Sequence, residues 1–339
     1  MSGEMAGSVV CIGESMAQIV PDDGAGLEHA SSFAITTAGA ESNVAIALAR
    51  LGTRASWAGF LGDDPLGRRI RDDLAAAGVA TPLVREVGGH RTGTFFKDPN
   101  PAGSTVYYYR SGSAATLMDV GYARSVLDTA PRAVHVTGVT LALSESCWES
   151  VTTLAREARA SGVPVSFDVN YRAPLWPDRR TAANAIEAVA RRSDIVFVGL
   201  DEAHALWNCA TADDVREILP EPRRLVVKDG AIECVVFSEE GRIAVPALPV
   251  EVVEPVGAGD AFAAGWLHGY LSGLDDPACV RLGHLMAGVA LTSHSDVGRL
   301  DVPADELVRR AAEGTDWIPA GTPAVGAATA QAGGSHAAL

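Results

Sequence analysis

The chain has 339 residues, of which 47% are hydrophobic and 20% are charged, so it can bury a large core in one or two domains. Its formal net charge of -15 argues against nucleic acid and anionic membranes as partners. A site for an anionic substrate would therefore have to be local, built from arginines, a lysine, backbone amides or a metal ion.

The cysteines and the N-terminus indicate where the protein works. Five cysteines are scattered without a C-x-x-C pair, which favours neither a zinc site nor a disulfide framework. Residues 1–8 carry no basic region followed by an apolar stretch, and no apolar run approaches the length of a membrane span. We expect a soluble protein of the reducing cytoplasm.

The first part of the chain predicts strands of two kinds. Residues 9–14 are a continuous apolar run, typical of a buried strand that ends in a glycine. Residues 15–20 and 31–36 are short strand patterns around a polar turn, and residues 91–97 and 104–110 repeat this arrangement. No helix separates the members of either pair, so we expect all four to join one small sheet.

Helix and strand signals lie between these two pairs. Residues 39–52 place apolar side chains on one helical face, and Gly52 ends that helix. Residues 56–61 form the next predicted strand. Pro65 begins a second helix, which ends at Gly78.

The rhythm becomes regular after Pro131. Apolar runs alternate with helical patterns, which is the signature of a parallel sheet covered by helices on both faces; the runs are 133–139, 163–169, 194–198 and 225–228. A hairpin and three helices follow, at 234–238 with 242–246, and at 261–272, 279–293 and 304–313. Residues 319–339 lack periodicity and predict a disordered tail.

One junction organises this pattern. The strand-like run 252–256 leads into a glycine turn, and Asp260 follows immediately before a helix of small and apolar residues. The first amides of a helix have no partner within it and attract an anion. Asp260 is then either a base that accepts a substrate proton or an ordinary helix cap, and residue physics alone leaves both interpretations open.

Two segments resemble the signatures of the ribokinase-like (PfkB) carbohydrate kinases. Residues 39–52, GAESNVAIALARLG, resemble the N-terminal signature, and residues 256–265, VGAGDAFAAG, resemble the C-terminal one. The resemblance implies a three-layer α/β/α sandwich over residues 8–318, with a mostly parallel central sheet. It also implies a small β-sheet lid from residues 14–37 and 88–112.

The resemblance implies roles for the residues at the junction. Asp260 would accept the proton of a sugar hydroxyl, and Gly257, Ala258 and Gly259 would hold the charge that develops on the transferred phosphoryl group. ATP and Mg²⁺ would be the cofactors.

Three stretches resemble the 2-keto-3-deoxygluconate kinases of this family, which phosphorylate the C6 hydroxyl of a sugar acid. They are GESM, YYYRSGSAA and DVNYRAPLW, beginning at residues 13, 107 and 168. The implied substrate-binding residues are Gly39, Asn43, Tyr108, Tyr109, Arg110, Arg172, Asp260 and Asp296. The alternative is that Tyr107 and Tyr109 form one face of a strand and that the arginines are surface charge.

The nucleotide side follows the family pattern less closely. The implied nucleotide-binding residues are Lys228, Gly230, Gly257, Gly259 and His284. Glu202 would hold the metal indirectly, through water, although Gly199 replaces the asparagine that usually precedes this glutamate. The alternative for Glu202 is an acid in the first turn of a helix.

Other functions fit the same residues. A fructokinase or ribokinase would share both signatures. A sugar-binding regulatory protein with a decayed nucleotide site is suggested by Gly199 and His284. The open edges of a lid sheet invite pairing, so a homodimer through the lid is also expected.

Overall fold

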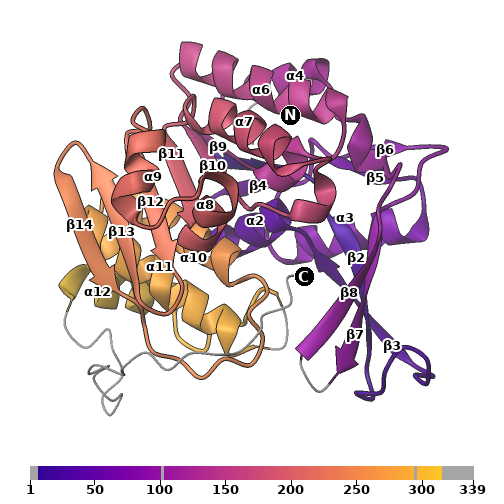
Figure 1. Cartoon of the computed structure of the whole chain (residues 1–339). Coiled ribbons are helices and arrows are strands. Elements are labelled where there is room, and N and C mark those ends of the chain that lie inside the picture. The colour runs from indigo at the N-terminus through magenta and orange to yellow at the C-terminus, as the bar shows by residue number, and fades with distance from the viewer. Residues whose placement is uncertain (1–6, 101–102, 294–295, 315–339) are drawn as a thin grey trace.

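The computed structural model describes residues 7–100, 103–293 and 296–314. A central sheet of eight strands runs through the molecule (Figure 1). In spatial order its strands are β14 (Gly241–Pro246), β13 (Glu233–Ser238), β12 (Arg224–Asp229), β11 (Ile195–Gly199), β10 (Val165–Asp168), β9 (Ala133–Thr137), β1 (Val9–Ile12) and β4 (Ala55–Ala58). The strands from β12 to β4 are parallel, and the predicted hairpin of β13 and β14 adds an antiparallel edge.

Helices cover both faces of this sheet and enclose two separate cores, as predicted. One face carries α4 (Val120–Leu127), α5 (Gly138–Leu141), α6 (Glu145–Ala160), α7 (Arg179–Ala190), α8 (Leu200–Trp207) and α9 (Ala212–Ile218). The other carries α2 (Ala40–Arg50), α3 (Pro65–Ala76), α10 (Ala258–Leu271), α11 (Asp276–Leu291) and α12 (Ala304–Glu313). Side chains alternate between the two cores along each strand, as the period of a strand requires: Ile195 faces one core and Val196 the other.

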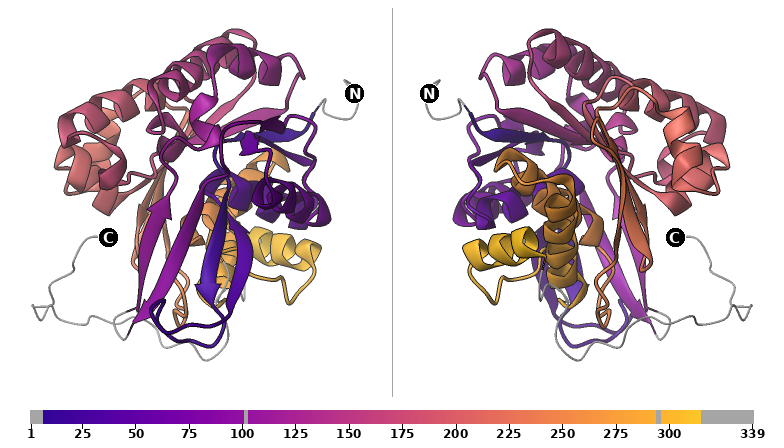
Figure 2. Two further views of the ribbon diagram at one scale, coloured as in Figure 1. Left: turned by 90° about the vertical axis from the view of Figure 1, so that its right-hand side faces the viewer. Right: turned by 90° about the vertical axis from the view of Figure 1, so that its left-hand side faces the viewer.

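A second sheet projects from the main body as a long twisted ribbon (Figures 1 and 2). Its strand order is β3 (Phe33–Ala38), β2 (Met16–Pro21), β7 (Thr94–Asn100) and β8 (Gly103–Tyr109). The prediction that four short strands share one small sheet is confirmed, and we call these four strands the lid sheet. Two 3-10 helices, η1 (Ala114–Leu117) and η2 (Ala173–Leu175), complete the elements that bear on the site.

The strand predicted over residues 56–61 is wrong as a single element. The chain leaves β4 at Gly59 and continues as β5 (Phe60–Gly62), which pairs with β6 (Arg85–Val87) in a separate two-stranded sheet. A Cβ at Gly59 would stand 2.5 Å from the Gly13 carbonyl oxygen. The glycine therefore permits a close passage of two backbones, which an apolar run does not reveal.

The strand-like run over residues 252–256 is also not a strand. It crosses from β14 to α10 beside the end of α11, where the amides of Val253 and Glu254 both donate to the Leu291 carbonyl. Val252 and Val256 are 55% and 41% exposed. Apolar composition alone predicted a strand, but this segment pairs with no other strand in the described chain.

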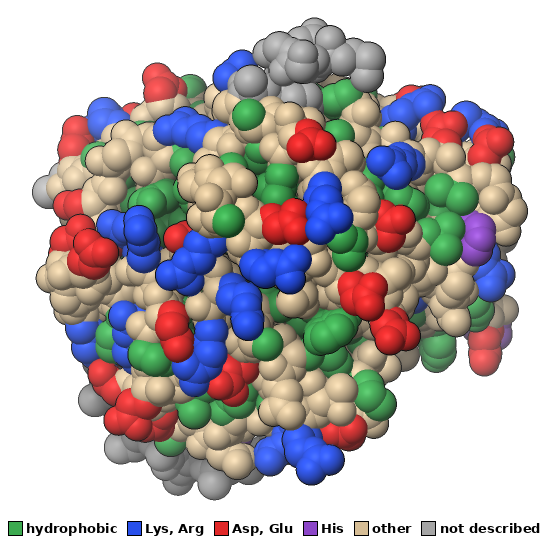
Figure 3. Space-filling view, turned by 90° about the horizontal axis from the view of Figure 1, so that it is seen from above, with side chains coloured by type: hydrophobic (Ala, Val, Ile, Leu, Met, Phe, Trp, Pro, Cys, Tyr) green, Lys and Arg blue, Asp and Glu red, His purple; other side chains and the backbone are tan. Residues whose placement is uncertain are grey.

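The surface mixes charges of both signs. On the face seen from above, where α4, α6 and α7 lie, basic side chains gather near the centre with acidic ones among them (Figure 3). Ion pairs such as Arg124 with Glu157 join the two signs. All five cysteines are buried and unpaired. In the part of the chain described, no helix has the length and apolar character to cross a membrane.

The contact between α10 and α11 depends on the absence of a side chain at Gly265. A Cβ there would stand 2.6 Å from the Leu282 carbonyl oxygen, which is backbone and cannot move aside cheaply. Gly265→Ala should lower the free energy of unfolding by about 1–3 kcal/mol despite the better helix propensity of alanine. Urea denaturation measures the difference.

The matched control is Gly88→Ala, at an exposed glycine whose added Cβ would meet nothing within 4 Å. It should change the free energy of unfolding by less than about 0.5 kcal/mol. Equal stability of the Gly265 and Gly88 variants would contradict close packing of the two helices.

Candidate active site

Asp260 lies in the first turn of α10, partly buried at the carboxyl ends of the parallel strands. The turn before it needs glycine, because Gly257 has a φ of 83°. The Ala258 amide donates weakly to the Pro255 carbonyl at 3.4 Å. The amides of Gly259 and Asp260 have no acceptor in the described part of the chain. Two donors at a helix N-terminus therefore stand open to an anion.

Asn43 holds the Asp260 carboxylate in place. Its side-chain amide donates to Asp260 Oδ2 at 2.8 Å, and it reaches across from α2, where it is 4% exposed. Burial raises the pKa of Asp260 to about 7; the Asn43 hydrogen bond and Arg172 lower it, while Asp168 and Asp296 raise it. A carboxyl group with this pKa is suited to accept a proton near neutral pH.

Lys228 supplies a cation beside the open amides. Its ammonium lies 3.3 Å from Asp168 Oδ2, and the two residues come from the carboxyl ends of β12 and β10. Burial lowers the pKa of Lys228, but the charges of Asp168, Glu202 and Asp260 outweigh it and leave that pKa raised. Lys228 therefore stays charged.

Glu202 is held by two backbone amides. Tyr171 donates to Oε1 and Gly199 donates to Oε2, both at 2.8 Å. Burial and the nearby Asp168 raise the pKa of Glu202, although Lys228 opposes this. The carboxylate thus ties the start of α8 to the segment after β10. Its link to a metal through water stays a prediction.

Arg172 follows β10 and is exposed, and its side chain forms no hydrogen bond or ion pair with the described residues. Its charge lowers the pKa of both Asp260 and Glu202. Asn170 lies two residues earlier with a φ of 36°, and its buried Oδ1 has no hydrogen-bond partner among the described residues. Strain and an unsatisfied oxygen at one position are typical of a binding site.

Arg110 is already paired inside the protein. It forms an ion pair with the buried Glu14, which also accepts a hydrogen bond from Ser113 at 2.7 Å. The Arg110 guanidinium lies 5.8 Å from the centre of the Tyr108 ring. In this structure Arg110 joins the end of the lid sheet to the first loop, and a contact with substrate stays a prediction.

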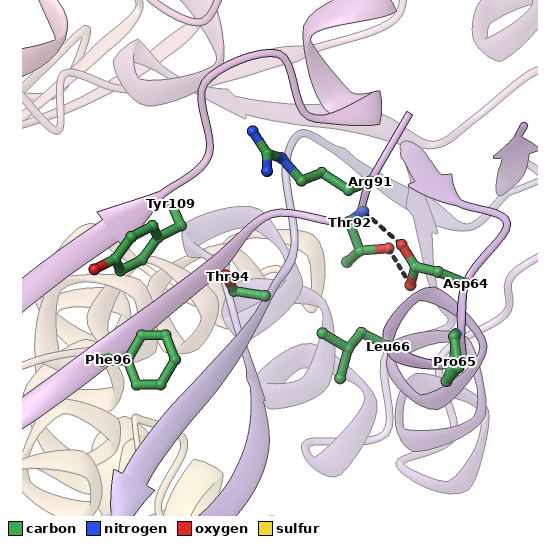
Figure 4. A pocket seen from close by; sticks show the side chains of 8 residues that line it. All are labelled: Asp64, Pro65, Leu66, Arg91, Thr92, Thr94, Phe96 and Tyr109. Carbon is green, nitrogen blue, oxygen red and sulfur yellow. Dashed lines mark hydrogen bonds between the residues drawn. The ribbon is translucent and has the colours of Figure 1, made fainter. Parts of the chain in front are cut away.

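Tyr108 and Tyr109 lie on opposite faces of the lid sheet. Tyr108 shares its face with Phe95 and Lys97, which contacts the main body. Tyr109 lies on the outer face and lines a pocket of about 480 Å³ beside the start of α3, as Figure 4 shows. Tyr108 therefore shares the face whose Lys97 contacts Asp296, whereas Tyr109 lies on the other face. A contact of either ring with substrate stays a prediction.

Asp296 and Gly257 are in direct contact. A Cβ at Gly257 would stand 2.0 Å from the Asp296 carbonyl oxygen. The buried Asp296 carboxylate accepts from Lys97 Nζ at 3.0 Å. Asp296 is therefore beside the turn of residues 255–259, which we call the anion-binding turn, and its carboxylate contacts a lysine of the lid sheet. Its contact with substrate stays a prediction.

The remaining predicted residues differ in setting. Gly39 caps α2 so closely that a Cβ would stand 2.3 Å from the Glu14 carbonyl oxygen. Gly230 follows β12 in an open turn with a φ of 49°. His284 is buried against Phe262, and burial lowers its pKa to about 4. These contacts give His284 a packing role, and its contact with adenine stays a prediction.

Sequence reasoning missed three residues of this site. Asp168 begins the DVNYRAPLW stretch, and a charged residue at the end of a buried strand was the signal that could have identified it. Lys97 reads as one polar residue of an alternating strand. Glu254 lies in the segment taken for a strand, so its proximity to Lys97 followed from no sequence pattern.

The geometry fits a phosphate group. A Cβ at Gly259 would stand 3.5 Å from Lys228 Nζ, so the bare glycine leaves open the space that the ammonium and the amides share. Among the described residues, no cluster of His, Cys, Asp or Glu could hold a metal ion by itself. A Mg²⁺ ion would take most of its ligands from phosphate oxygens and water, as it commonly does.

Two glycine substitutions distinguish the effect of the turn on stability from its effect on ATP binding. Gly257→Ala should cost at least about 2 kcal/mol of stability, because it strains a positive φ and meets backbone at 2.0 Å. Gly259→Ala meets only ordinary contacts, so it should keep the melting temperature but weaken ATP binding. Thermal unfolding and calorimetric titration with ATP measure the two effects. Equal loss of stability in both variants would contradict this assignment.

Known sequences resemble this chain over most of its length. The model of the pfkB family carbohydrate kinases matches residues 6–302. The 2-dehydro-3-deoxygluconokinase of Bacillus subtilis is 34% identical over 86% of this chain and 91% of its own. The enzyme of the same name from Thermoproteus tenax is 33% identical, covering 89% and 94%. The 2-dehydro-3-deoxygalactonokinase of Haloferax volcanii is 30% identical, covering 92% and 98%.

Solved structures of proteins with similar sequences or folds support the same family. A PfkB protein from Polaromonas sp. JS666 is 35% identical with a TM-score of 0.79, covering 86% of this chain and 97% of its own. Two further solved structures are only 24% and 21% identical to this chain, so their similarity shows the fold alone. They are 2-dehydro-3-deoxygluconokinase from Thermotoga maritima (TM-score 0.81, covering 90% of this chain and 98% of its own) and a putative ribokinase II from E. coli solved with ATP and Mg²⁺ (TM-score 0.79, covering 90% of this chain and 99% of its own). With its ribokinase-like fold, the chain belongs to the pfkB family of carbohydrate kinases.

Proposed function

We propose that the protein transfers the γ-phosphoryl group of ATP to the C6 hydroxyl of 2-keto-3-deoxygluconate, also called 2-dehydro-3-deoxygluconate. One observation supports the chemistry above all others: the Asp260 carboxylate, fixed by Asn43 at 2.8 Å, stands beside two open amides and the Lys228 ammonium. These are the parts that phosphoryl transfer to an alcohol requires. An ATP-dependent reaction of this kind also suits the cytoplasm.

The proposed reaction forms one bond and breaks one. The C6 oxygen bonds to the γ-phosphorus, the bond from that phosphorus to the β,γ-bridging oxygen breaks, and ADP leaves. The hydroxyl proton goes to Asp260. The amides of Gly259 and Asp260 and the Lys228 ammonium stabilise the charge on the transferred group. Mg²⁺ bound to the phosphates would reduce their negative charge, with Glu202 acting through water.

The acidic substrate is supported by the arginine at the mouth of the site. Arg172 is exposed, its charge lowers the pKa of Asp260, and its side chain forms no ion pair with the described residues, so its guanidinium is available to a sugar acid. Tyr108 on the inner face of the lid sheet would cover the sugar and limit the access of water. Relatives named for both the gluconate and the galactonate sugar acids leave the stereochemistry at C4 to experiment.

We also propose that the outer face of the lid sheet pairs with a second copy of the chain. Tyr107, Tyr109 and Phe33 are 46%, 58% and 40% exposed there. Several exposed aromatic side chains on one face of a sheet favour an interface. Light scattering that finds a monomer at micromolar concentration would contradict this proposal.

Asp260→Asn keeps the shape of the side chain and removes its ability to accept a proton. Turnover should fall by roughly 100-fold or more. A coupled assay of ADP release with 2-keto-3-deoxygluconate measures turnover, and circular dichroism checks that the fold is retained. Undiminished turnover in a folded variant would reject Asp260 as the base, and the absence of sugar-dependent ADP release from the unmodified protein would favour a decayed nucleotide site.

The pKa of about 7 predicts how activity depends on pH. Because the base must be ionised to accept a proton, kcat/KM should fall as the pH drops through about 7. Asn43→Ala removes a hydrogen bond that lowers the pKa, so its acid limb should move to higher pH. ATP ionises alike in both assays, which makes the shift between the two proteins diagnostic. Identical acid limbs would contradict the assignment.

Arg172→Ala tests the substrate class. It should raise KM for sugar acids by about 10-fold or more while leaving KM for fructose and ribose nearly unchanged, because only the acids carry a carboxylate. A panel of both kinds of sugar with the unmodified protein gives the reference values. A higher kcat/KM for fructose or ribose in the unmodified protein would assign it to a fructokinase or ribokinase instead.

A further inference from the structure

Lys97 carries a positive charge into the junction between the lid sheet and the main body. Its side chain is 5% exposed, and its ammonium lies 3.0 Å from Asp296 Oδ1 and 3.4 Å from Glu254 Oε2. The two carboxylate side chains are 5% and 19% exposed. A buried cluster of this kind is sensitive to the loss of one member, because the remaining charges are then uncompensated.

Both carboxylates belong to segments that contact the anion-binding turn. Glu254 lies three residues before Gly257, and its Oε1 accepts from the Val256 amide at 3.2 Å. Asp296 supplies the backbone carbonyl against which Gly257 packs. One ammonium therefore contacts both segments that set the position of Gly257.

The ammonium itself belongs to the other body of the molecule. Lys97 is in β7 of the lid sheet, which projects beside the main body (Figure 2). Lys97 shares the inner face of this sheet with Phe95 and Tyr108. Among the described residues, no other salt bridge joins the lid sheet to the segments around Gly257.

We propose that Lys97 is a positioning residue that couples closure of the lid sheet to alignment of the anion-binding turn, residues 255–259. With the lid sheet in place, the ammonium fixes Glu254 and Asp296, and through them the backbone around Gly257. When the lid sheet moves away, the ammonium leaves and the two carboxylates repel each other. The turn is thus completed only when the sugar is covered, which limits transfer of the phosphoryl group to water.

The charges around Asp260 supply a second readout. Asn43 from α2, Asp168 from β10, Arg172 after β10, Lys228 from β12 and Asp296 all act on this carboxyl group. Asp296 raises the pKa of Asp260. Loss of Lys97 would leave the charge of Asp296 uncompensated and raise that pKa further, which a purely structural contact would not do.

Lys97→Met is the direct test, because methionine keeps the length and apolar stem of the side chain. With the best sugar substrate, kcat should fall at least about tenfold, with a smaller change in KM for ATP. The acid limb of kcat/KM should move to higher pH. Amide hydrogen exchange over residues 94–109 should become faster in the absence of any substrate. Lys97→Arg should restore most of the activity, and Arg124→Met, which breaks an exposed ion pair elsewhere, should change none of these.

Glu254→Gln in the Lys97→Met background keeps the proposal testable if the single variant is unstable. Removing one of the two uncompensated carboxylates should recover part of the lost stability and activity, so the two substitutions should not be additive. Additive effects, or sugar kinetics and exchange rates that match the unmodified protein, would overturn the coupling.

The coupling by Lys97 rests on the proposed function only in assuming that the reaction is phosphoryl transfer to a sugar acid. Faster exchange in Lys97→Met, in a protein that phosphorylates no sugar acid, would support the coupling and contradict the proposed substrate. If Lys97→Met shows unchanged exchange and the same sugar-acid turnover as the unmodified protein, the coupling is contradicted and the proposed substrate is supported.

Discussion

Negative charge crowded around one helix N-terminus is the constraint on which this structure depends. Four carboxylates, from Asp168, Glu202, Asp260 and Asp296, lie near the start of α10. Two unit charges 4 Å apart interact by about 4 kcal/mol at an intermediate dielectric, so such a group needs compensation. Lys228, Lys97 and the backbone amides provide it. Each cation comes from a different sheet, so the balance of charge requires the main sheet and the lid sheet to be in place together.

Phosphoryl transfer requires that the positive groups do not fully neutralise Asp260. Lys228 and the open amides must attract an anionic phosphoryl group, yet Asp260 must remain basic beside them. Partial burial resolves the conflict, because it raises the pKa of Asp260 to about 7 while the Asn43 hydrogen bond keeps the carboxylate directed. The site therefore combines a weakly acidic group and an anion-binding turn within one helical turn.

Much of the fold could be predicted, because strand and helix periods in the second half of the chain are regular. The lid sheet followed from four short strands without intervening helices, and Asp260, Asn43 and Lys228 followed from motifs. The break at Gly59 depends on a backbone contact with Gly13, and the exposed segment at 252–256 on the absence of a partner strand. The Lys97 cluster joins residues about 150 to 200 positions apart, which no local pattern encodes.

Strand β8 presents different side chains on its two faces, and this limits the insertions that the strand can accept during evolution. Tyr108 faces inward and its neighbours Tyr107 and Tyr109 face outward, because successive residues of a strand alternate. A single inserted residue would exchange the two sets, turning Tyr108 outward and the outer aromatic rings inward. Such an insertion would need a β-bulge or a second inserted residue to keep both faces in place.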